Sequence, residues 1–302
     1  MAEQRRIHQC FEAWDFQGPW HQSMISLYLT CPKQFKLRYV DNIRSDAKSS
    51  AMCAGTAMHG TIATMHTDNA FDHYEDIFQS EWDAVVKEDD ENKFRDTEAA
   101  KLPGKRIEGL EIVKQYSVVE RDAAVTFVEV PFEVEIGGEK FAGTIDQIRQ
   151  SGDEIQLVDL KSNLAAPSSL YLEKNLQFSI YAYGILNGIL KPPSGDVELG
   201  ILPVPYWYHL RNLLPYKKNG KTRGGRVYKK GDLKGNPMMK TPRNEADMEK
   251  LVQTIGDITK AIKMGVFFER PSSLGSCVGF CQYHAACNGE YHFADNAIIL
   301  PE

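Results

Sequence analysis

The segment Phe141–Lys161, FAGTIDQIRQSGDEIQLVDLK, decides the fold. Within it, Phe141–Arg149 and Glu154–Lys161 alternate apolar and polar residues and contain β-branched side chains. Between these two runs stands Ser-Gly-Asp at 151–153, a sequence typical of a tight turn. Alternation with a period of two on both sides of such a turn predicts an antiparallel β-hairpin.

Two carboxylates and one lysine of this hairpin are expected to lie close together. Asp159 and Lys161 have the same parity in the second strand, so their side chains share one face. The turn brings the first strand alongside, and Asp146 is expected about two residues diagonally from Asp159. Carboxylate oxygens hold Mg²⁺ or Mn²⁺, and a neighbouring lysine can orient a water or offset charge during phosphodiester cleavage. For the hairpin alone, the alternative is an exposed cross-strand ion pair.

Segments with helical and strand periodicity occupy the rest of the chain. Helices are expected over residues 20–42 with a break at Pro32, 55–82, 109–120, 172–190 and 244–264. Further strands are expected over residues 125–136 and 197–210. This order predicts an α+β, or mixed α/β, fold in which a central, mostly antiparallel or mixed sheet is flanked by helices.

Composition narrows the class of protein. The formal net charge of −6 argues against a protein that coats nucleic acid by bulk electrostatics, although a local basic stripe is enough for DNA binding. No run approaches the roughly 18 apolar residues of a membrane-spanning helix, and the first residues lack the apolar core of a signal peptide. We therefore expect a cytoplasmic protein of a bacterial or phage-infected cell, without a membrane partner.

Five short motifs stand in order along the chain. They are Ser26–Phe35 followed by Tyr39, Gly55–His59, Gly143–Asp146, Asp159–Lys161 and Gln177–Tyr181. They resemble the S-x-L-x-x-(Y)-x-x-C-P-x-x-F, G-x-x-x-H, G-x-x-D, D-x-K and Q-x-x-x-Y motifs of the RecB-like branch of the PD-(D/E)XK nuclease superfamily, with Tyr28 offset from its usual place. The resemblance covers about residues 23–183 and the C-terminal cysteines. It implies a restriction-endonuclease-like core and a metal-dependent deoxyribonuclease.

The resemblance also implies roles for individual residues. The implied ligands of Mg²⁺ or Mn²⁺ are His59, Asp146, Asp159 and the carbonyl of Leu160. Lys161 would be the catalytic lysine, while Gln177 and Tyr181 would position that lysine or the DNA backbone. Glu129 would be an outer-shell or second-metal carboxylate. Core packing remains the alternative for His59 and for Tyr181.

Cysteines are clustered near the C-terminus, which favours a metal or cluster over disulfides in a reducing compartment. The RecB-like family includes a group, resembling CRISPR-associated and AddB-type exonucleases, that holds a [4Fe–4S] cluster. The implied ligands here are Cys31, Cys277, Cys281 and Cys287. Their C-terminal spacing is C-x3-C-x5-C, whereas that group has C-x2-C-x5-C. Zn²⁺, bound by four thiolates or by three with His284, is the alternative, and a site without metal is a third.

A second feature with a possible DNA-binding role is a basic segment at about 215–237. Its cations include Lys217, Lys218, Lys221, Arg223, Arg226, Lys229 and Lys230. In an acidic protein such a loop is a candidate for contacts with DNA phosphates. A solvated loop without a partner is the alternative.

We therefore expect a single RecB-like nuclease domain over residues 1–302. Its parts would be an N-terminal helical part at about 20–120, a catalytic core at about 125–210, the basic loop, and a C-terminal helix with the cysteine cluster at about 244–292. The expected activity is exonuclease cleavage of single-stranded DNA or DNA ends in recombination, repair or replication. Because no G-x-x-x-x-G-K-[ST] motif is present, a separate helicase or recombination protein is an expected partner. A site- or structure-specific endonuclease and a non-catalytic DNA-binding assembly subunit are the alternatives.

Overall fold

A computed structural model defines the fold. It describes residues 16, 18–43, 49–90, 96–163, 165–215, 221–223, 226–228, 235–270, 281, 283–289, 292–294 and 297–299. The chain divides into two compact units. The first unit combines residues 1–45, 135–142 and 249–302, and the second combines residues 46–134 and 143–248.

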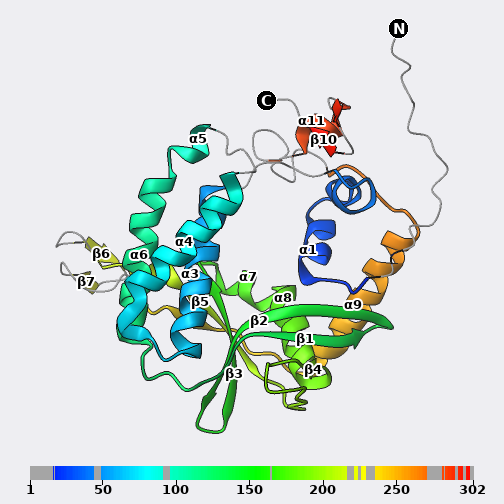
Figure 1. The fold of residues 1–302 in the computed structure, drawn as a ribbon. Coiled ribbons are helices and arrows are strands. Elements are labelled where there is room, and N and C mark those ends of the chain that lie inside the picture. The colour runs from blue at the N-terminus through cyan, green and yellow to red at the C-terminus, as the bar shows by residue number, and fades with distance from the viewer. Residues whose placement is uncertain are drawn as a thin grey trace. The chain divides into compact units, whose positions relative to one another are not determined.

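A six-stranded sheet forms the centre of the second unit (Figure 1). Its strands, in spatial order, are β4 (Ile189–Leu190), β1 (Val125–Ile136), β2 (Glu139–Ser151), β3 (Glu154–Lys161), β5 (Val204–His209) and β8 (Met238–Lys240). Strand β3 pairs antiparallel with β2 and parallel with β5, so the sheet is mixed. The fold class predicted from the sequence is therefore confirmed.

Helices cover both faces of this sheet. One face is covered by α3 (Ser50–Thr67), α4 (Tyr74–Asp90) and α6 (Leu102–Val119), whose apolar side chains share a core with Val158 and Leu160 of β3. The opposite face is covered by α8 (Leu176–Asn187), where Phe178 contacts the ring of Trp207 in β5. Side chains alternate between the faces of a strand, so this packing directs Asp159 and Lys161 of β3 toward the α8 side.

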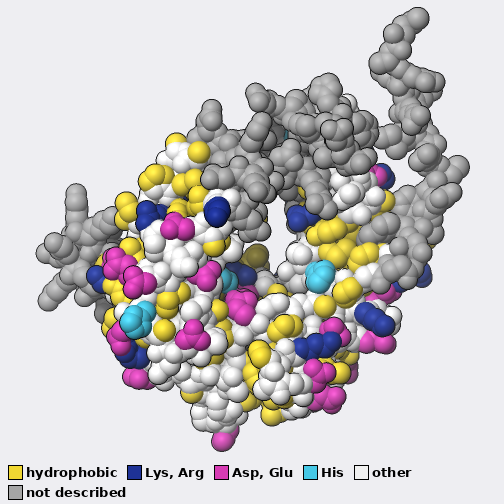
Figure 2. Space-filling model, viewed as in Figure 1, with side chains coloured by type: hydrophobic (Ala, Val, Ile, Leu, Met, Phe, Trp, Pro, Cys, Tyr) yellow, Lys and Arg dark blue, Asp and Glu magenta, His cyan; other side chains and the backbone are white. Residues whose placement is uncertain are grey.

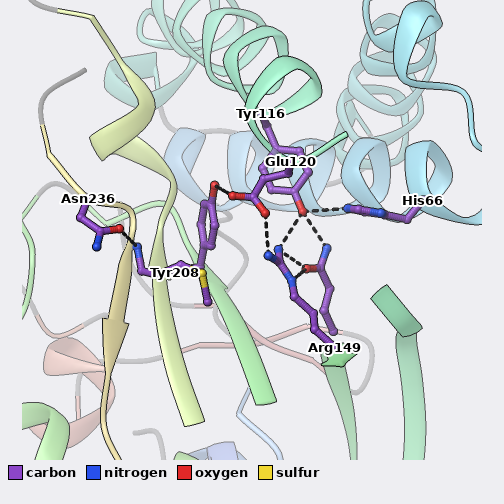
Figure 3. A network of polar contacts seen from close by, with 8 residues as sticks. His66, Tyr116, Glu120, Arg149, Tyr208 and Asn236 are labelled. Carbon is purple, nitrogen blue, oxygen red and sulfur yellow. Dashed lines mark hydrogen bonds and ion pairs between the residues drawn. The ribbon is translucent and has the colours of Figure 1, made fainter. Parts of the chain in front are cut away.

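A buried polar network ties the first group of helices to the sheet. Figure 3 shows the carboxylate of Glu120 between Tyr208 and Arg149, and the Tyr116 hydroxyl between Arg149 and His66. Glu120 accepts hydrogen bonds from the Tyr208 hydroxyl at 2.8 Å and from Arg149 at 2.5 Å. The Tyr116 hydroxyl lies 3.2 Å from Arg149 and 2.9 Å from His66 Nε2. Because the buried ion pair is surrounded by these hydrogen bonds, its desolvation is largely compensated.

Short elements connect these layers. They are η2 (Phe71–His73), α5 (Asp96–Ala99), α7 (Ser169–Glu173) and η3 (Leu210–Leu213). Strands β6 (Lys221–Arg223) and β7 (Arg226–Tyr228) form a separate antiparallel hairpin in the basic segment.

The first unit is mainly helical. It contains α1 (Gln22–Thr30), α2 (Pro32–Phe35), the π-helix η1 (Lys36–Val40), most of α9 (Glu245–Lys263), α11 (His284–Cys287) and the hairpin of β9 (His292–Ala294) and β10 (Ala297–Ile299). Its aromatic core includes Phe35, which stacks on Phe267 with ring centroids 6.1 Å apart. The Tyr28 hydroxyl donates to the carbonyl of Val266 at 2.8 Å.

Several sequence-predicted boundaries agree with the structure, and four elements differ. The helix expected over 55–82 begins earlier, at Ser50, and is divided into α3 and α4, while the helix expected over 109–120 begins at Leu102. Strands β1 and β3 begin and end where the alternation does, and the first helix breaks before Pro32. The helix predicted over 172–190 is instead divided, because the Asn175 side chain caps the start of α8 and Gly188 ends it. The strand predicted over 197–210 begins only at Val204; before it, Val197 forms an isolated bridge with Leu190.

Candidate active site

The hairpin of β2 and β3 sets the spacing of the two candidate aspartates. Its last backbone pair on this side joins Gln147 to Val158. Extended by one pair, the same register puts Asp146 directly opposite Asp159, whereas the sequence suggested a diagonal relation. Beyond that pair Asp146 Oδ2 accepts a hydrogen bond from the amide of Leu160 at 2.6 Å. The Asp146 carboxylate therefore serves as the acceptor for the Leu160 amide, where a regular ladder would offer a main-chain carbonyl of β2.

Asp159 is buried and is held by two side chains. Lys161 Nζ lies 2.9 Å from its Oδ1 and 2.8 Å from its Oδ2. Gln177 of α8 donates to Oδ1 through Nε2 at 2.9 Å. Only 1% of the surface of Asp159 is exposed, which excludes the interpretation of an exposed surface ion pair.

Close packing brings α8 to these strands. Gly143 of β2 and Gly184 of α8 both face the ring of Phe132, where an added Cβ would lie 2.7 Å and 2.6 Å from ring carbons. The same ring meets Tyr181 edge to face, with centroids 5.5 Å apart. Two glycines around one phenylalanine thus allow the helix to present Gln177 and Tyr181 next to Asp159.

A second cluster joins α3 to β1 and β2. His59 Nδ1 lies 3.7 Å from Asp146 Oδ2 and 3.8 Å from Glu129 Oε1. One ligand atom from each of the three residues lies within 4.8 Å of the other two, a grouping that could hold a metal ion. Glu129 reaches it from a strand position with a left-handed backbone, φ 44°.

The electrostatics of the site show an excess of buried negative charge. Burial raises the pKa of Asp146 and of Asp159, and the nearby cations only partly oppose this effect. Burial alone would lower the pKa of Lys161, but Asp159 and Asp146 outweigh it and raise that pKa. The pKa of His59 is raised in the same way, because Asp146 and Glu129 outweigh its burial. A cation bound here would relieve this imbalance.

Comparison with known proteins identifies the family of the chain. A family model described as the PD-(D/E)XK nuclease superfamily matches residues 19–288. The chain belongs to the PD-(D/E)XK nuclease superfamily. No curated protein matches this PD-(D/E)XK chain significantly. Among solved structures, a "Putative exonuclease" from Eubacterium rectale matches with a TM-score of 0.46 and 11% identity, covering 92% of this chain and 90% of that one.

Nucleases of this superfamily use divalent metal ions, and the residues present here fit one. His59, Glu129 and Asp146 offer an imidazole nitrogen and two carboxylates, which suit Mg²⁺ or Mn²⁺ better than a soft metal. Asp159 Oδ2 is buried and accepts no hydrogen bond of good geometry from the described residues, although Lys161 Nζ lies 2.8 Å away. A buried carboxylate oxygen of this kind has a lone pair available for a metal or a water.

Three of the four described cysteines, Cys31, Cys281 and Cys287, belong to the first unit, whereas Cys53 is buried in α3 of the second. Cys281 and Cys287 pack against a small core that includes Leu37 and Tyr283. Burial and the neighbouring Glu269 raise the pKa of Cys287 to about 11, and the Cys31 thiol acts in the same direction. Cys277 lies outside the described residues.

The basic segment is described only in part. The backbones of Lys221 and Arg223 lie in β6, and that of Arg226 lies in β7. Lys217, Lys218, Lys229 and Lys230 lie outside the described residues. Among the helices of the described residues, none combines the length and the hydrophobicity that a membrane-spanning segment needs.

Two residues near the site were missed by sequence reasoning. Trp207 pairs with Asp159 across the parallel β3–β5 register, and Lys161 Nζ lies 5.9 Å from the centroid of its ring. Arg243 is buried and donates hydrogen bonds to Ser179 and to the carbonyl of Asn175, at the start of α8. The aromatic run from Tyr206 to Tyr208 was a signal for the first, but its partner strand could be known only from the fold.

Proposed function

We propose that this chain is a RecB-like, metal-dependent DNA exonuclease that acts on single-stranded DNA or DNA ends. The observation that carries the proposal is the buried carboxylate of Asp159, which is bound by Lys161 and Gln177 and stands beside the group His59–Glu129–Asp146. The proposed context is recombination, repair or replication, with a separate helicase or recombination protein as partner.

Each side chain has a distinct proposed task. His59, Asp146 and Asp159, with the carbonyl of Leu160, would hold Mg²⁺ or Mn²⁺, and Glu129 would add a further carboxylate. Lys161 stays an ammonium because Asp159 and Asp146 raise its pKa, so it would stabilise negative charge rather than accept a proton. When bound, the metal would lower the pKa of a coordinated water and polarise the scissile phosphate.

The roles proposed for the two α8 residues follow from their state at neutral pH. Burial and Asp159 raise the pKa of Tyr181 to about 12, so its phenol is neutral and can donate a hydrogen bond. Gln177 fixes Asp159 Oδ1 and leaves Oδ2 for other partners. Together they would hold the carboxylate and the lysine in a fixed geometry before the DNA arrives, which lowers the reorganisation needed for reaction.

The iron–sulfur branch is part of the proposal. Cys31, Cys277, Cys281 and Cys287 would ligate a [4Fe–4S] cluster, and the packing of Cys281 and Cys287 against one small core supports this set. A cluster needs four thiolates, so its assembly would displace the Cys287 proton that burial retains. Iron and sulfide analysis of protein purified without oxygen tests this assignment; stoichiometric Zn²⁺ in place of iron would contradict it.

One experiment tests the nuclease assignment. Wild-type protein and Asp159→Ala are incubated with end-labelled linear single-stranded DNA in Mg²⁺, Mn²⁺ or EDTA. We expect cleavage only by the wild type and only with metal, with a loss of at least about a thousandfold in the variant. Asp153→Ala, in the exposed turn of the same hairpin, is the matched control and should retain full activity. Equal activity of wild type and Asp159→Ala would exclude this active site.

Substrate topology separates an exonuclease from an endonuclease. A circular single strand of the same sequence has no ends and should survive under conditions that degrade the linear strand completely. Loss of the circle at a similar rate would support the endonuclease alternative and leave the active-site assignment intact.

A further inference from the structure

A cavity of about 940 Å³ opens on the helical side of the second unit, between α4, α6 and η3. We call it the α6 cavity; its lining includes Tyr74, Lys101, Lys105, Ile107, Lys114 and Arg211. Its volume is at the large end of the range of about 300–1,000 Å³ usual for ligand sites. Figure 2 shows basic, acidic and apolar side chains interspersed over this helical part.

The α6 cavity adjoins a second, much smaller hollow of about 20 Å³ near the end of the candidate catalytic strand. This hollow shares Lys105, Glu108 and Arg211 with the α6 cavity and reaches Ser162, the residue after Lys161. Gly55 of α3 lies against the same serine, since an added Cβ would be 3.3 Å from Ser162 Oγ. Lys105 and Arg211 therefore line both the α6 cavity and the small hollow that reaches Ser162.

The cations at this junction are bound by a single acid. Arg211 donates to both carboxylate oxygens of Glu108, at 2.7 Å and 2.5 Å, and Lys105 Nζ lies 3.5 Å from Glu108 Oε2. Such a fork is the geometry in which arginine also binds a phosphate. Glu108 thus occupies the position that a phosphate oxygen pair would take.

The remaining lining suits unpaired bases. Tyr74 is half-buried, and Ile107 is 72% exposed on the rim of the α6 cavity. Aromatic and aliphatic faces of this kind stack on bases that are free of a partner strand, whereas a duplex presents mainly phosphates. Four basic side chains face three acidic ones, Glu75, Glu108 and Glu111, so the cavity is basic in a chain whose formal net charge is −6.

We propose that the α6 cavity binds the single-stranded part of the DNA substrate adjacent to the cleavage site, and that Glu108 competes with DNA phosphate for Arg211 and Lys105. The proposal rests on the nuclease function proposed above. Its consequence is unusual for a binding site: removing an acidic side chain from the protein strengthens binding without adding a contact. The tighter DNA binding depends on Arg211 and Lys105, because loss of the Glu108 charge frees both cations to bind phosphate.

Binding without cleavage tests this directly. A fluorescent oligothymidylate of about 20 nucleotides is titrated with full-length protein in EDTA, and the Kd is read by anisotropy at several salt concentrations. We expect Glu108→Gln to tighten binding about three- to tenfold and Arg211→Gln to weaken it by a similar factor. We also expect Arg211→Gln to reduce the salt slope by about 0.7, the value for one phosphate contact on a single strand.

Two further variants keep the test independent of folding. Adding Arg211→Gln to Glu108→Gln should cancel most of the gain. The double variant removes both partners of the part-buried ion pair, so of the two cations only Lys105 remains. Lys114→Gln alters an exposed lysine of the lining and should weaken binding while leaving the thermal unfolding midpoint unchanged.

Glu154→Gln is the matched control. Glu154 has a side-chain exposure of 28%, close to the 27% of Glu108, and it pairs with Lys240 at the opposite end of β3. Glu154→Gln removes the same charge as Glu108→Gln and should leave the Kd nearly unchanged. An equal gain in Glu154→Gln would reduce the effect to net charge and overturn the proposal, as would unchanged affinities in Glu108→Gln and Arg211→Gln.

Cleavage distinguishes this failure from failure of the proposed function. If wild type degrades linear DNA in Mg²⁺ while the cavity variants bind as it does, only the α6 cavity proposal is lost. If wild type degrades no DNA but the variants shift the Kd as expected, the nuclease function is lost and the cavity stands as a DNA-binding site. A blunt duplex affected as strongly as the oligothymidylate would overturn the assignment to single strands.

Discussion

At the scale of single residues, Glu129 joins the candidate metal group through a strained backbone. Its φ of 44° is in the left-handed region, which for a residue other than glycine costs on the order of 1–3 kcal/mol. The strain is located inside β1, four residues from its start at Val125. Glu129 Oε1 ends 3.8 Å from His59 Nδ1, so the unusual backbone directs a carboxylate toward the site.

Replacing Glu129 with glycine therefore has opposite effects on stability and on metal binding. Glu129→Gly relieves the strain, and we expect the free energy of unfolding without metal to stay within about 1 kcal/mol of wild type or to rise. The affinity for Mn²⁺, measured by calorimetry, should fall. Glu133→Gly, at an exposed position of the same strand, is the control and should lower stability by about 1 kcal/mol. Equal destabilisation by the two substitutions would show that Glu129 is not strained.

At the scale of elements, the start of α8 is held by one buried guanidinium. Arg243 donates hydrogen bonds to the carbonyls of Leu172 and Asn175 at 2.9 Å and 3.0 Å, and to Ser179 Oγ at 2.9 Å. It also contacts Thr241 and so joins the end of β8 to α8. Since α8 carries Gln177, this residue positions the hydrogen bond to Asp159 from a distance.

We expect Arg243→Met to lower kcat more than it raises KM, because it loosens the helix that carries Gln177 rather than a contact with DNA. Measured well below the unfolding midpoint, kcat should fall about tenfold or more, in line with misplaced catalytic groups. Stability should fall by about 1–3 kcal/mol because carbonyls lose their donor. Lys174→Met, at an exposed lysine of the same loop, should change neither. A loss of stability with kcat unchanged would assign Arg243 a structural role alone.

The helices and strands also show how much of the fold can be predicted from the sequence. Strand β1 was predictable because a half-buried strand alternates in burial and therefore in polarity. Strand β3 is instead buried on both faces from Leu157 to Leu160, and the turn at 151–153 was the signal for its start. The division between α7 and α8 was missed although its signal, the capping residue Asn175, is local. No local pattern could show that Trp207 lies beside Asp159, because their parallel pairing depends on residues far apart in the chain. The left-handed turn at Glu129 breaks the alternation from which its direction would be deduced.

At the scale of the whole molecule, the polar network behind the sheet makes stability depend on pH. Burial and the nearby Arg149 lower the pKa of His66 to about 4, from an ordinary value of 6.5. The folded protein therefore keeps His66 neutral while the unfolded chain takes up a proton. The stabilisation is complete above about pH 6.5 and is lost as pH falls toward 4, with a slope of at most about 1.4 kcal/mol per pH unit.

Chemical unfolding of wild type and His66→Gln between pH 4 and 7.5 measures this effect. Glutamine can still bond the Tyr116 hydroxyl but does not titrate in this range, so the difference between the two free energies should vary with pH in favour of the variant at low pH. Asp146 and Asp159 have raised pKa values and act in the opposite direction in both proteins, so they cancel in the difference. A difference that is constant with pH would place the titration elsewhere.

The bond from the Leu160 amide to Asp146 Oδ2 affects how an inactive protein should be prepared for crystallisation with DNA. Truncation of Asp146 would remove a candidate metal ligand and also open the last rung between β2 and β3, so the trapped complex would show a distorted hairpin. Lys161→Met leaves that rung in place and removes only the ammonium. It is therefore the better variant for capturing an uncut substrate in an undisturbed site.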